Sequence, residues 1–153
     1  MSFSGKPTTF VEQVIENEGF WPNLSVAEFQ KGYRLPAEFL VDMLVADLTT
    51  AMIEVNRDLA KRKSQWQSAG ITSVESADPM VLQERTFHAA TYKRAVYCRA
   101  KASLLPQFAS VVRRESAENL GKEEPERKET FLEFSQQAVR SLQGRGRITA
   151  ALL

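Results

Sequence analysis

Few residues in this chain carry the chemistry of metal sites or disulfide bonds, because its 153 residues include one cysteine and one histidine. A single cysteine, Cys98, excludes an intramolecular disulfide, and a zinc site usually takes several Cys or His ligands. His88 lies on the same predicted helix, where ten residues correspond to about 15 Å, too far for a thiol and its general base. His88 is expected to be a packed or half-exposed helix residue and Cys98 a core or helix-surface residue. The chain is predicted to be a non-enzyme with no catalytic residue, metal or cofactor.

Net charge and long apolar runs are also scarce. With 20 Lys and Arg against 19 Asp and Glu, the net charge is +1, which is typical neither of a polycation made for nucleic acid nor of an acidic tail. No apolar run approaches the roughly 20 residues that cross a bilayer, and the leader MSFSGKPTT lacks the apolar core of a signal peptide. We expect a protein of a reducing, cytoplasmic compartment with no membrane contact.

What the sequence does contain is typical of one helical domain. Apolar residues make up 43% of the chain and charged residues 25%, within a length usual for one domain. We predict an all-α fold in which residues 1–35 form an N-terminal arm with a short helix, residues 36–143 the helical core, and residues 144–153 an extended C-terminal tail.

The arm carries an aromatic pair in the stretch GFWPNLSVAEF, residues 19–29. Pro22 biases Trp21 towards extended geometry, so Phe20 and Trp21 are expected on a loop. Two interpretations stay open. The pair either pins the arm onto the chain's own helical core or fills a groove of a partner.

Two capping boxes are present in the arm. Thr9 with Glu12 predicts a helix that begins near residue 10. Ser25 with Glu28 predicts a second, short helix. This second helix would end at Gly32 and would bury Leu24 and Phe29.

A long helix is predicted from Pro36, in the first helical position, to about Ala69, with Gly70 as its stop. Its acidic residues come early and its basic residues late, which complements the helix dipole. Apolar residues recur at steps of three and four and form one stripe: Phe39, Leu40, Leu44, Leu48, Ala51, Met52, Val55 and Leu59. The three principal helices are predicted near residues 37–69, 80–105 and 126–143.

The second principal helix is predicted to begin at Asp78 and Pro79, after a turn-rich stretch. Five alanines make it thin, so a neighbouring helix can approach closely. Pro106 removes a backbone donor and is expected to end or kink the helix. Its apolar residues are Leu82, Phe87, Ala90, Val96, Tyr97, Ala100 and Leu104.

The third helix is predicted to follow Pro125 and to stop at Gly144. In the tail GRGRITAALL, Ile148, Ala150 and Leu152 alternate as in a short strand. We predict that this tail docks on a partner, for example by adding a strand to the edge of its sheet. The apolar stripe of the third helix is Phe131, Phe134, Ala138 and Leu142.

Basic residues cluster mildly on the second helix and beyond it. They are able to contact phosphates, which leaves a small helical nucleic-acid-binding regulator as an alternative function. A solvated or subunit-pairing face is the other interpretation, because no recognition-helix signature accompanies them. The carboxylates lie among other helix-surface charges, and the GRGR segment lacks the strand and helix of a phosphate-binding loop, so neither indicates an enzyme. The basic residues are Lys93, Arg94, Arg99, Lys101, Arg113, Arg114, Arg140, Arg145 and Arg147.

Four stretches of the chain match one known family in order and spacing. They are NEGFWPNLSVAEFQKGYRL (17–35), AMIEVNRDLAKRKSQWQSAGITSV (51–74), YKRAVYCRAKASLL (92–105) and GRGRITAALL (144–153). In these stretches, which span most of the chain, it resembles the head completion (GPL) proteins of contractile-tailed phages. Asn23 stands where that family often has an acidic residue.

The resemblance implies a non-enzymatic head-to-tail connector that assembles on the portal after DNA packaging and prepares the vertex for the tail. A homo-oligomeric ring of about twelve subunits, matching the portal, is what the family leads us to expect. The implied partners are the portal protein, a tail or neck completion protein and, without sequence specificity, the packaged DNA. The implied location is the head–tail junction of the virion, with assembly in the host cytoplasm.

Two sets of residues are predicted to carry these contacts. The interface set, from the aromatic pair and the tail, is Phe20, Trp21, Pro22, Ile148, Leu152 and Leu153. The set predicted to face DNA or the lumen of the ring is Lys93, Arg94, Arg99, Arg145 and Arg147.

Overall fold

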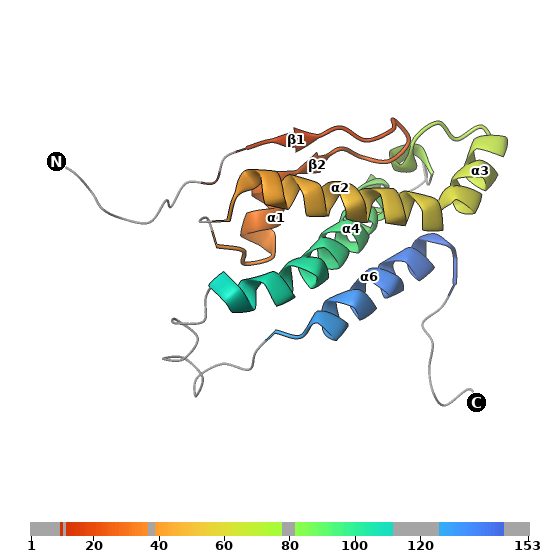
Figure 1. Ribbon diagram of the computed structural model, residues 1–153. Coiled ribbons are helices and arrows are strands. Elements are labelled where there is room, and N and C mark those ends of the chain that lie inside the picture. Colours follow the sequence, from red (N-terminus) through yellow and green to blue (C-terminus); the bar gives the residue numbers. More distant parts are fainter. Residues whose placement is uncertain (1–9, 11, 37–38, 78–81, 112–125, 146–153) are drawn as a thin grey trace, which may run out of the picture.

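Helices make up most of the structure, a computed structural model that describes residue 10 and residues 12–36, 39–77, 82–111 and 126–145. The long helix α4 (Leu82–Val111) passes between α2 (Val41–Asp58) and α6 (Lys128–Leu142) and contacts both of them (Figure 1). The predicted all-α class is thus confirmed in its coarse form, since the described strands form a single short pair. The core is the layer in which α4 meets its two neighbours and the arm.

The arm begins with two short antiparallel strands, β1 (Val14–Ile15) and β2 (Leu24–Ser25). The helix predicted to begin near residue 10 is therefore wrong. Ile15 and Leu24 are cross-strand partners and both are buried, whereas an isolated helix of about two turns is marginal in water. The carboxylate of Glu12 accepts a hydrogen bond of 2.8 Å from the serine hydroxyl at the end of β2.

The short helix α1 (Val26–Gly32) follows β2 directly, as the second capping box predicts. Ser25 is its N-cap and accepts a hydrogen bond of 3.1 Å from the backbone N–H of Glu28. Leu24 and Phe29 are fully buried, also as predicted. A local signal of cap and first turn was sufficient to locate this element.

The helix predicted over residues 36–69 is in fact two helices, α2 and α3 (Ala60–Ser68), which meet at Leu59. The backbone of Leu59 has φ −99° and ψ 5°, outside the α-helical region, and its side chain is fully buried. Figure 1 shows that α3 turns away from the axis of α2 after this residue. The turn brings Trp66 of α3 against the aromatic pair of the arm, which explains why the helix does not continue straight.

α2 also begins later than predicted, at Val41 rather than next to Pro36. Leu40 is its N-cap, with extended backbone and a side chain that is 73% exposed, so its predicted place in the buried stripe is wrong. The helical periodicity does not apply to Leu40 because this residue precedes the first helical turn. Met52 is half-buried, and the remaining members of the stripe are buried: Phe39, Leu44, Leu48, Ala51, Val55 and Leu59.

α4 continues through Pro106, so of the two predicted outcomes, an end or a kink of the helix, the end is wrong. The ring nitrogen cannot donate to the carbonyl one turn earlier. On the same turn, Gln107 Nε2 donates to the carbonyl oxygen of Ser103 at 3.2 Å. Phe87 is 54% exposed and Ala90 is also exposed, contrary to the predicted stripe. The stripe members that are buried are Val96, Tyr97, Ala100 and Leu104.

α6 packs along the thin, alanine-rich face of α4, as the composition of that helix predicts. Ala95 and Ala100 of α4 and Ser135 of α6 have no exposed surface. Ser135 Oγ donates to the carbonyl oxygen of Ala95 at 2.7 Å, which requires close approach of the two helices. Gly144, with φ +75°, ends α6 in the left-handed conformation that favours glycine.

The connection between α3 and α4 contains a single 3-10 turn, η1 (Val74–Ser76). Val74 is fully buried, and its N–H donates to the carbonyl oxygen of Phe20 at 3.0 Å, which ties this connection to the arm. The predicted helix signals at Asp78, Pro79 and Pro125, the side chain of Leu82, and the predicted strand in the tail lie outside the described residues.

Candidate interaction surfaces

The aromatic pair of the arm lies inside the chain's own core. Trp21 stacks on Tyr92 of α4 with 4.9 Å between ring centroids and 5° between planes. Phe20 meets Trp21 edge-on at 4.9 Å and stacks on Trp66 at 6.1 Å. Phe20 and Trp21 are 3% and 2% exposed. The structure therefore favours the interpretation in which the pair pins the arm onto the helical core.

This burial limits what the pair itself offers to a partner. With 2–3% of their surface exposed, the rings of Phe20 and Trp21 leave almost no area for a second chain. Pro22 is half-buried beside them. The interface role of the three residues stays a prediction. In such a role, the rings would hold the arm in the position from which it contacts a partner.

A closed ring of three hydrogen bonds lies next to the aromatic cluster. Asn17 Nδ2 donates to Tyr92 Oη at 2.7 Å, Tyr92 Oη donates to Asn56 Oδ1, and Asn56 Nδ2 donates back to Asn17 Oδ1 at 2.9 Å. Burial raises the pKa of Tyr92 well above its ordinary value. The ring joins the arm, α2 and α4, and every polar group in it has a partner, which is the condition for a buried network to stabilise a fold.

A second aromatic cluster lies beneath α1. Phe29 stacks on Tyr97 at 5.3 Å, and Tyr33 meets Tyr97 edge-on at 5.6 Å. Tyr97 Oη accepts a hydrogen bond of 3.0 Å from the backbone N–H of Ser25, so α4 also fixes the cap of α1. Burial raises the pKa of Tyr97, so the hydroxyl keeps its proton.

The two candidate reactive side chains lie in packing positions, as predicted. Cys98 is 1% exposed, and burial raises the pKa of its thiol, which disfavours the nucleophilic thiolate. His88 is half-buried, with its ring centroid 5.7 Å from that of Trp66. Among the described residues, neither side chain has the partner geometry of a catalytic pair.

The cations predicted to face DNA on α4 are largely engaged within the subunit. Lys93 pairs with Glu28 at 3.3 Å, and Arg94 lies 4.9 Å above the ring of Phe134. Arg99 Nη2 lies 3.0 Å from Asp58 Oδ2, and its Nε donates to a serine hydroxyl of α6 at 3.2 Å. Lys93 and Arg99 are thus paired with carboxylates, whereas Arg94 is exposed and has no carboxylate partner among the described residues. Arg145 is exposed, and Arg147 lies outside the described residues.

Lys101 has a structural role in the core. Its position in the predicted basic cluster gave no indication of this role. Lys101 is 1% exposed, and its ammonium group pairs with Glu126 at 2.7 Å. The ammonium also donates to the carbonyl oxygen of Tyr33 and lies 4.6 Å from the ring centroid of Phe131. Lys101 thus joins α4 to the end of α1 and the start of α6. Only its position among alanines and leucines on one helix hinted at burial.

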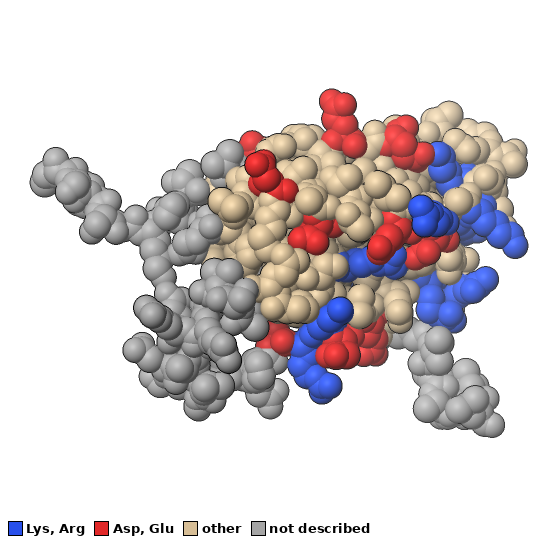
Figure 2. Space-filling view, viewed as in Figure 1, with Lys and Arg blue, Asp and Glu red and all other residues tan. Residues whose placement is uncertain are grey.

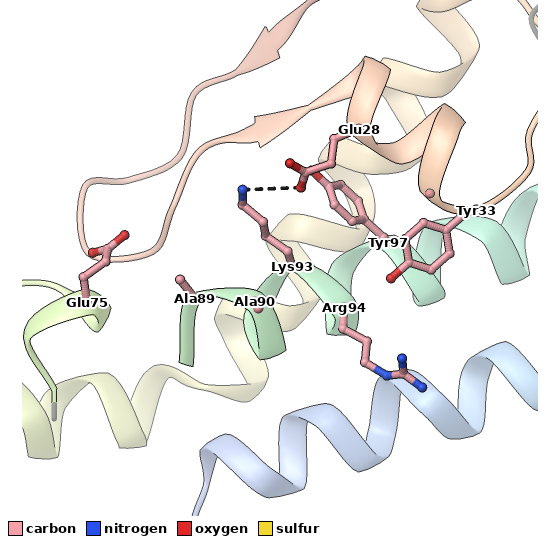
Figure 3. Close-up of a pocket in the computed structure, with 9 residues that line it drawn as sticks. Glu28, Tyr33, Glu75, Ala89, Ala90, Lys93, Arg94 and Tyr97 are labelled. Atoms are coloured by element: carbon pink, nitrogen blue, oxygen red, sulfur yellow. Dashed lines mark ion pairs between the residues drawn. The ribbon is translucent and has the colours of Figure 1, made fainter. Parts of the chain in front are cut away.

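A groove of about 490 Å³ opens between α1, η1 and α4. Figure 3 shows Lys93 reaching from α4 to Glu28 of α1 across the groove, while Arg94 points away towards α6. Its walls combine aromatic and small apolar side chains with charges of both signs. The lining residues are Glu28, Gly32, Tyr33, Glu75, Ala89, Ala90, Lys93, Arg94 and Tyr97.

Comparison with known proteins shows what this helical core is. The family model described as phage head completion protein (GPL) matches residues 15–153. The chain belongs to the GPL family of phage head completion proteins. It is also 32% identical over 151 residues to the "Probable head completion/stabilization protein" of Haemophilus phage HP1 (strain HP1c1), covering 99% of each chain. No solved structure shows a significant match to the chain.

Membership of the GPL family identifies the chain as a structural protein associated with the phage head, and the family is not a class of enzymes. The match covers both aromatic clusters, the groove and the described helices. It gives no support to the alternative of a small nucleic-acid-binding regulator.

Two further observations describe this GPL-family chain. Within residues 12–36, 39–77, 82–111 and 126–145, no group of three or more His, Cys, Asp or Glu side chains is arranged to hold a metal ion. None of the described helices is both long and apolar enough to cross a membrane. The predicted tail contacts, Ile148, Leu152 and Leu153, lie outside the described residues.

Proposed function

We propose that this protein is a head-to-tail connector that forms a ring on the portal after DNA packaging and prepares the vertex for the tail. The observation that carries the proposal is the match to the head completion family over residues 15–153. A ring of about twelve subunits would match the symmetry of the portal, and closed rings of identical subunits use one repeated interface. The partners are then the portal, the neighbouring subunits and a tail or neck completion protein.

The fold suits this role because its described core contacts lie within one subunit. Two aromatic clusters, a polar ring and a buried lysine tie the arm, α2, α4 and α6 into one core. A connector subunit of this kind folds first and then adds to the vertex, so that assembly is governed by its surfaces.

The direct test uses DNA-filled, portal-bearing heads that lack this protein. Added protein is expected to make the packaged DNA resistant to external nuclease and to let tails attach. Electron microscopy of the treated vertices is expected to show a ring of density on the portal. Nuclease resistance without any ring at the vertex would contradict the connector proposal.

The C-terminal tail offers a sharper test of how the connector docks. We propose that Ile148, Leu152 and Leu153 contact a neighbouring subunit or the portal, because an apolar segment of this kind suits docking better than solvent. Replacing all three with serine is expected to leave the thermal midpoint unchanged and to reduce assembly onto heads at least about tenfold, as loss of interface anchors does. The matched control replaces Ala150 and Ala151 with serine. Full assembly by the triple variant would remove the tail from the interface.

A further inference from the structure

A small cavity of about 110 Å³ lies where α2 ends, α3 begins and α6 ends. The side chains that line it carry charges or amides and are Asp58, Lys61, Arg62, Gln65, Gln143 and Arg145. Three of the six are cations, and the one acid already pairs with Arg99 at 3.0 Å. The cavity therefore has an excess of positive charge.

Several hydrogen-bond donors of these cations have no partner in the part of the chain that the structure describes. Lys61 and Arg145 are exposed, and their side chains make no hydrogen bond or ion pair with the described part of the chain. Arg62 uses Nε to donate to the carbonyl oxygen of Leu142 at 3.0 Å and Nη1 to contact Gln65 Oε1 at 3.4 Å. Its Nη2 faces Gly144, where a β-carbon would lie 3.8 Å away.

The helix ends at this site do not account for these free cations. The C-terminal carbonyl groups of α2 and α6 attract positive charge because of the helix dipoles. Gln143 Nε2 already donates to the carbonyl oxygen of Asp58 at 3.0 Å, and Arg62 Nε donates to that of Leu142. Lys61 and Arg145 are additional to these capping contacts.

The positive charge extends beyond the cavity. Arg57 is exposed on the last turn of α2, four residues before Lys61. Figure 2 shows Lys and Arg side chains gathered at the end of the molecule where α3 and the C-terminus of α6 lie. Cations both inside and outside the cavity suit a ligand with a repeated negative charge better than a single free ion.

We propose that this cavity binds a phosphate group of a DNA backbone, with Lys61, Arg62 Nη2 and Arg145 as donors, and that Arg57 contacts a neighbouring phosphate. Protein–DNA interfaces are more polar and more positive than protein–protein interfaces, which usually have an apolar core. The polar lining of the cavity therefore favours DNA over an acidic protein surface. The site is distinct from the α4 cations, which contact other side chains of the same subunit. The proposal rests on the proposed function, which places the protein at a DNA-filled head.

The test measures binding of the full-length chain to a fluorescent, mixed-sequence DNA duplex over a range of salt concentrations. Wild type is expected to bind at low salt and to lose affinity as salt rises. The double variant Lys61→Gln and Arg145→Gln is expected to bind at least about tenfold more weakly and to reduce the salt slope by about 2, because two phosphate contacts are lost. The matched control, Arg127→Gln with Lys128→Gln, removes two exposed cations from the other end of α6 and is expected to change affinity less than about twofold.

Three results would overturn the proposal. The first is absence of DNA binding by wild type at low salt, and the second is equal loss of affinity in both double variants. The third is displacement of the DNA by polyglutamate as effectively as by unlabelled DNA, which would indicate an acidic protein partner. Circular dichroism melts of the variants confirm that each one is folded. If the chain does not bind DNA at this cavity but still completes heads, the proposed function is unaffected, because that function is measured on heads.

Discussion

At the scale of single residues, Trp21 joins the arm to both α3 and α4. Its ring stacks on Tyr92 and meets Trp66 at 6.1 Å. We expect Trp21→Ala to lower the free energy of unfolding by about 3 to 5 kcal/mol, as truncation of a buried aromatic ring does. Urea denaturation measures this change. Phe87→Ala, at a ring that is 54% exposed, is the control and is expected to cost less than about 1 kcal/mol.

The same variant separates the two interpretations of the aromatic pair. If Trp21→Ala assembles onto heads in proportion to its remaining folded fraction, the pair serves the subunit's own core. If the variant is as stable as wild type but fails to assemble, the packing described for Trp21 is not its main role. This result would support the prediction that the pair lies at an interface.

The polar ring makes a residue-scale prediction of a different kind. Tyr92→Phe keeps the aromatic stack but leaves Asn17 Nδ2 and Asn56 Oδ1 each without one partner, which is expected to cost about 1 to 3 kcal/mol. Tyr33→Phe is the control, because it keeps the ring contacts and removes a hydroxyl whose described hydrogen bond, with Cys98 Sγ at 3.9 Å, is weak. Urea midpoints compare the two variants. Equal losses would show that the ring adds no stability of its own.

At the scale of elements, Pro106 interrupts the hydrogen bonds of a helix that nonetheless continues. Pro106→Ala restores one backbone donor on an exposed position, so it is expected to raise stability, by an amount up to the roughly 3 kcal/mol that proline costs in a helix interior. Ser103→Ala, also exposed on α4, is the control and gains only a few tenths of a kcal/mol. Thermal melts followed by circular dichroism measure both. A lower midpoint for Pro106→Ala would mean that the proline rigidifies the end of α4.

The elements that sequence predicts well are those whose cause is local. The N-cap of α1 at Ser25 and the glycine that ends α6 each depend on residues within one turn. The break at Leu59 and the strand at residues 14–15 depend on distant partners, Trp66 against the arm and Leu24 across the hairpin. No periodicity within a single segment contains that information, because a continuous apolar stripe is compatible with either a straight or a broken helix.

The candidate surfaces divide in the same way. The sequence shows where the cations are but not which groups they contact. The ammonium of Lys101, for example, contacts a carbonyl group 68 residues away and the carboxylate of Glu126. The cavity at Lys61, Arg62 and Arg145 joins residues from the middle of the chain to a residue that follows α6. It becomes recognisable only when α6 is placed beside the start of α3.

At the scale of the whole molecule, buried tyrosine hydroxyls and a buried thiol predict that the fold loses stability at alkaline pH. Burial is the main cause that raises the pKa of Tyr33, Tyr92, Tyr97 and Cys98 above their ordinary values. The unfolded chain releases these protons near pH 9 for the cysteine and near pH 10 for the tyrosines, while the folded chain retains them. Stability from these groups is thus complete below about pH 9 and falls as pH rises further.

Urea midpoints measured from about pH 8 to about pH 11 test this limit, because the midpoint follows the proton linkage. Tyrosinate absorbance, recorded in parallel, is expected to rise together with unfolding. Ionisation of all three tyrosines near pH 10 in a chain that stays folded would contradict the burial described for them.

The arm also dictates the order in which the molecule is completed during synthesis. Asn17 bonds to Tyr92 across 75 residues, and Ser25 bonds to Tyr97 across 72 residues. The arm leaves the ribosome first, yet the helix that receives it is made much later, so its docking waits for α4 and belongs to the slow, non-local part of folding. Until then Phe20 and Trp21 are exposed, which makes a chain interrupted before α4 a ready substrate for chaperones and for aggregation.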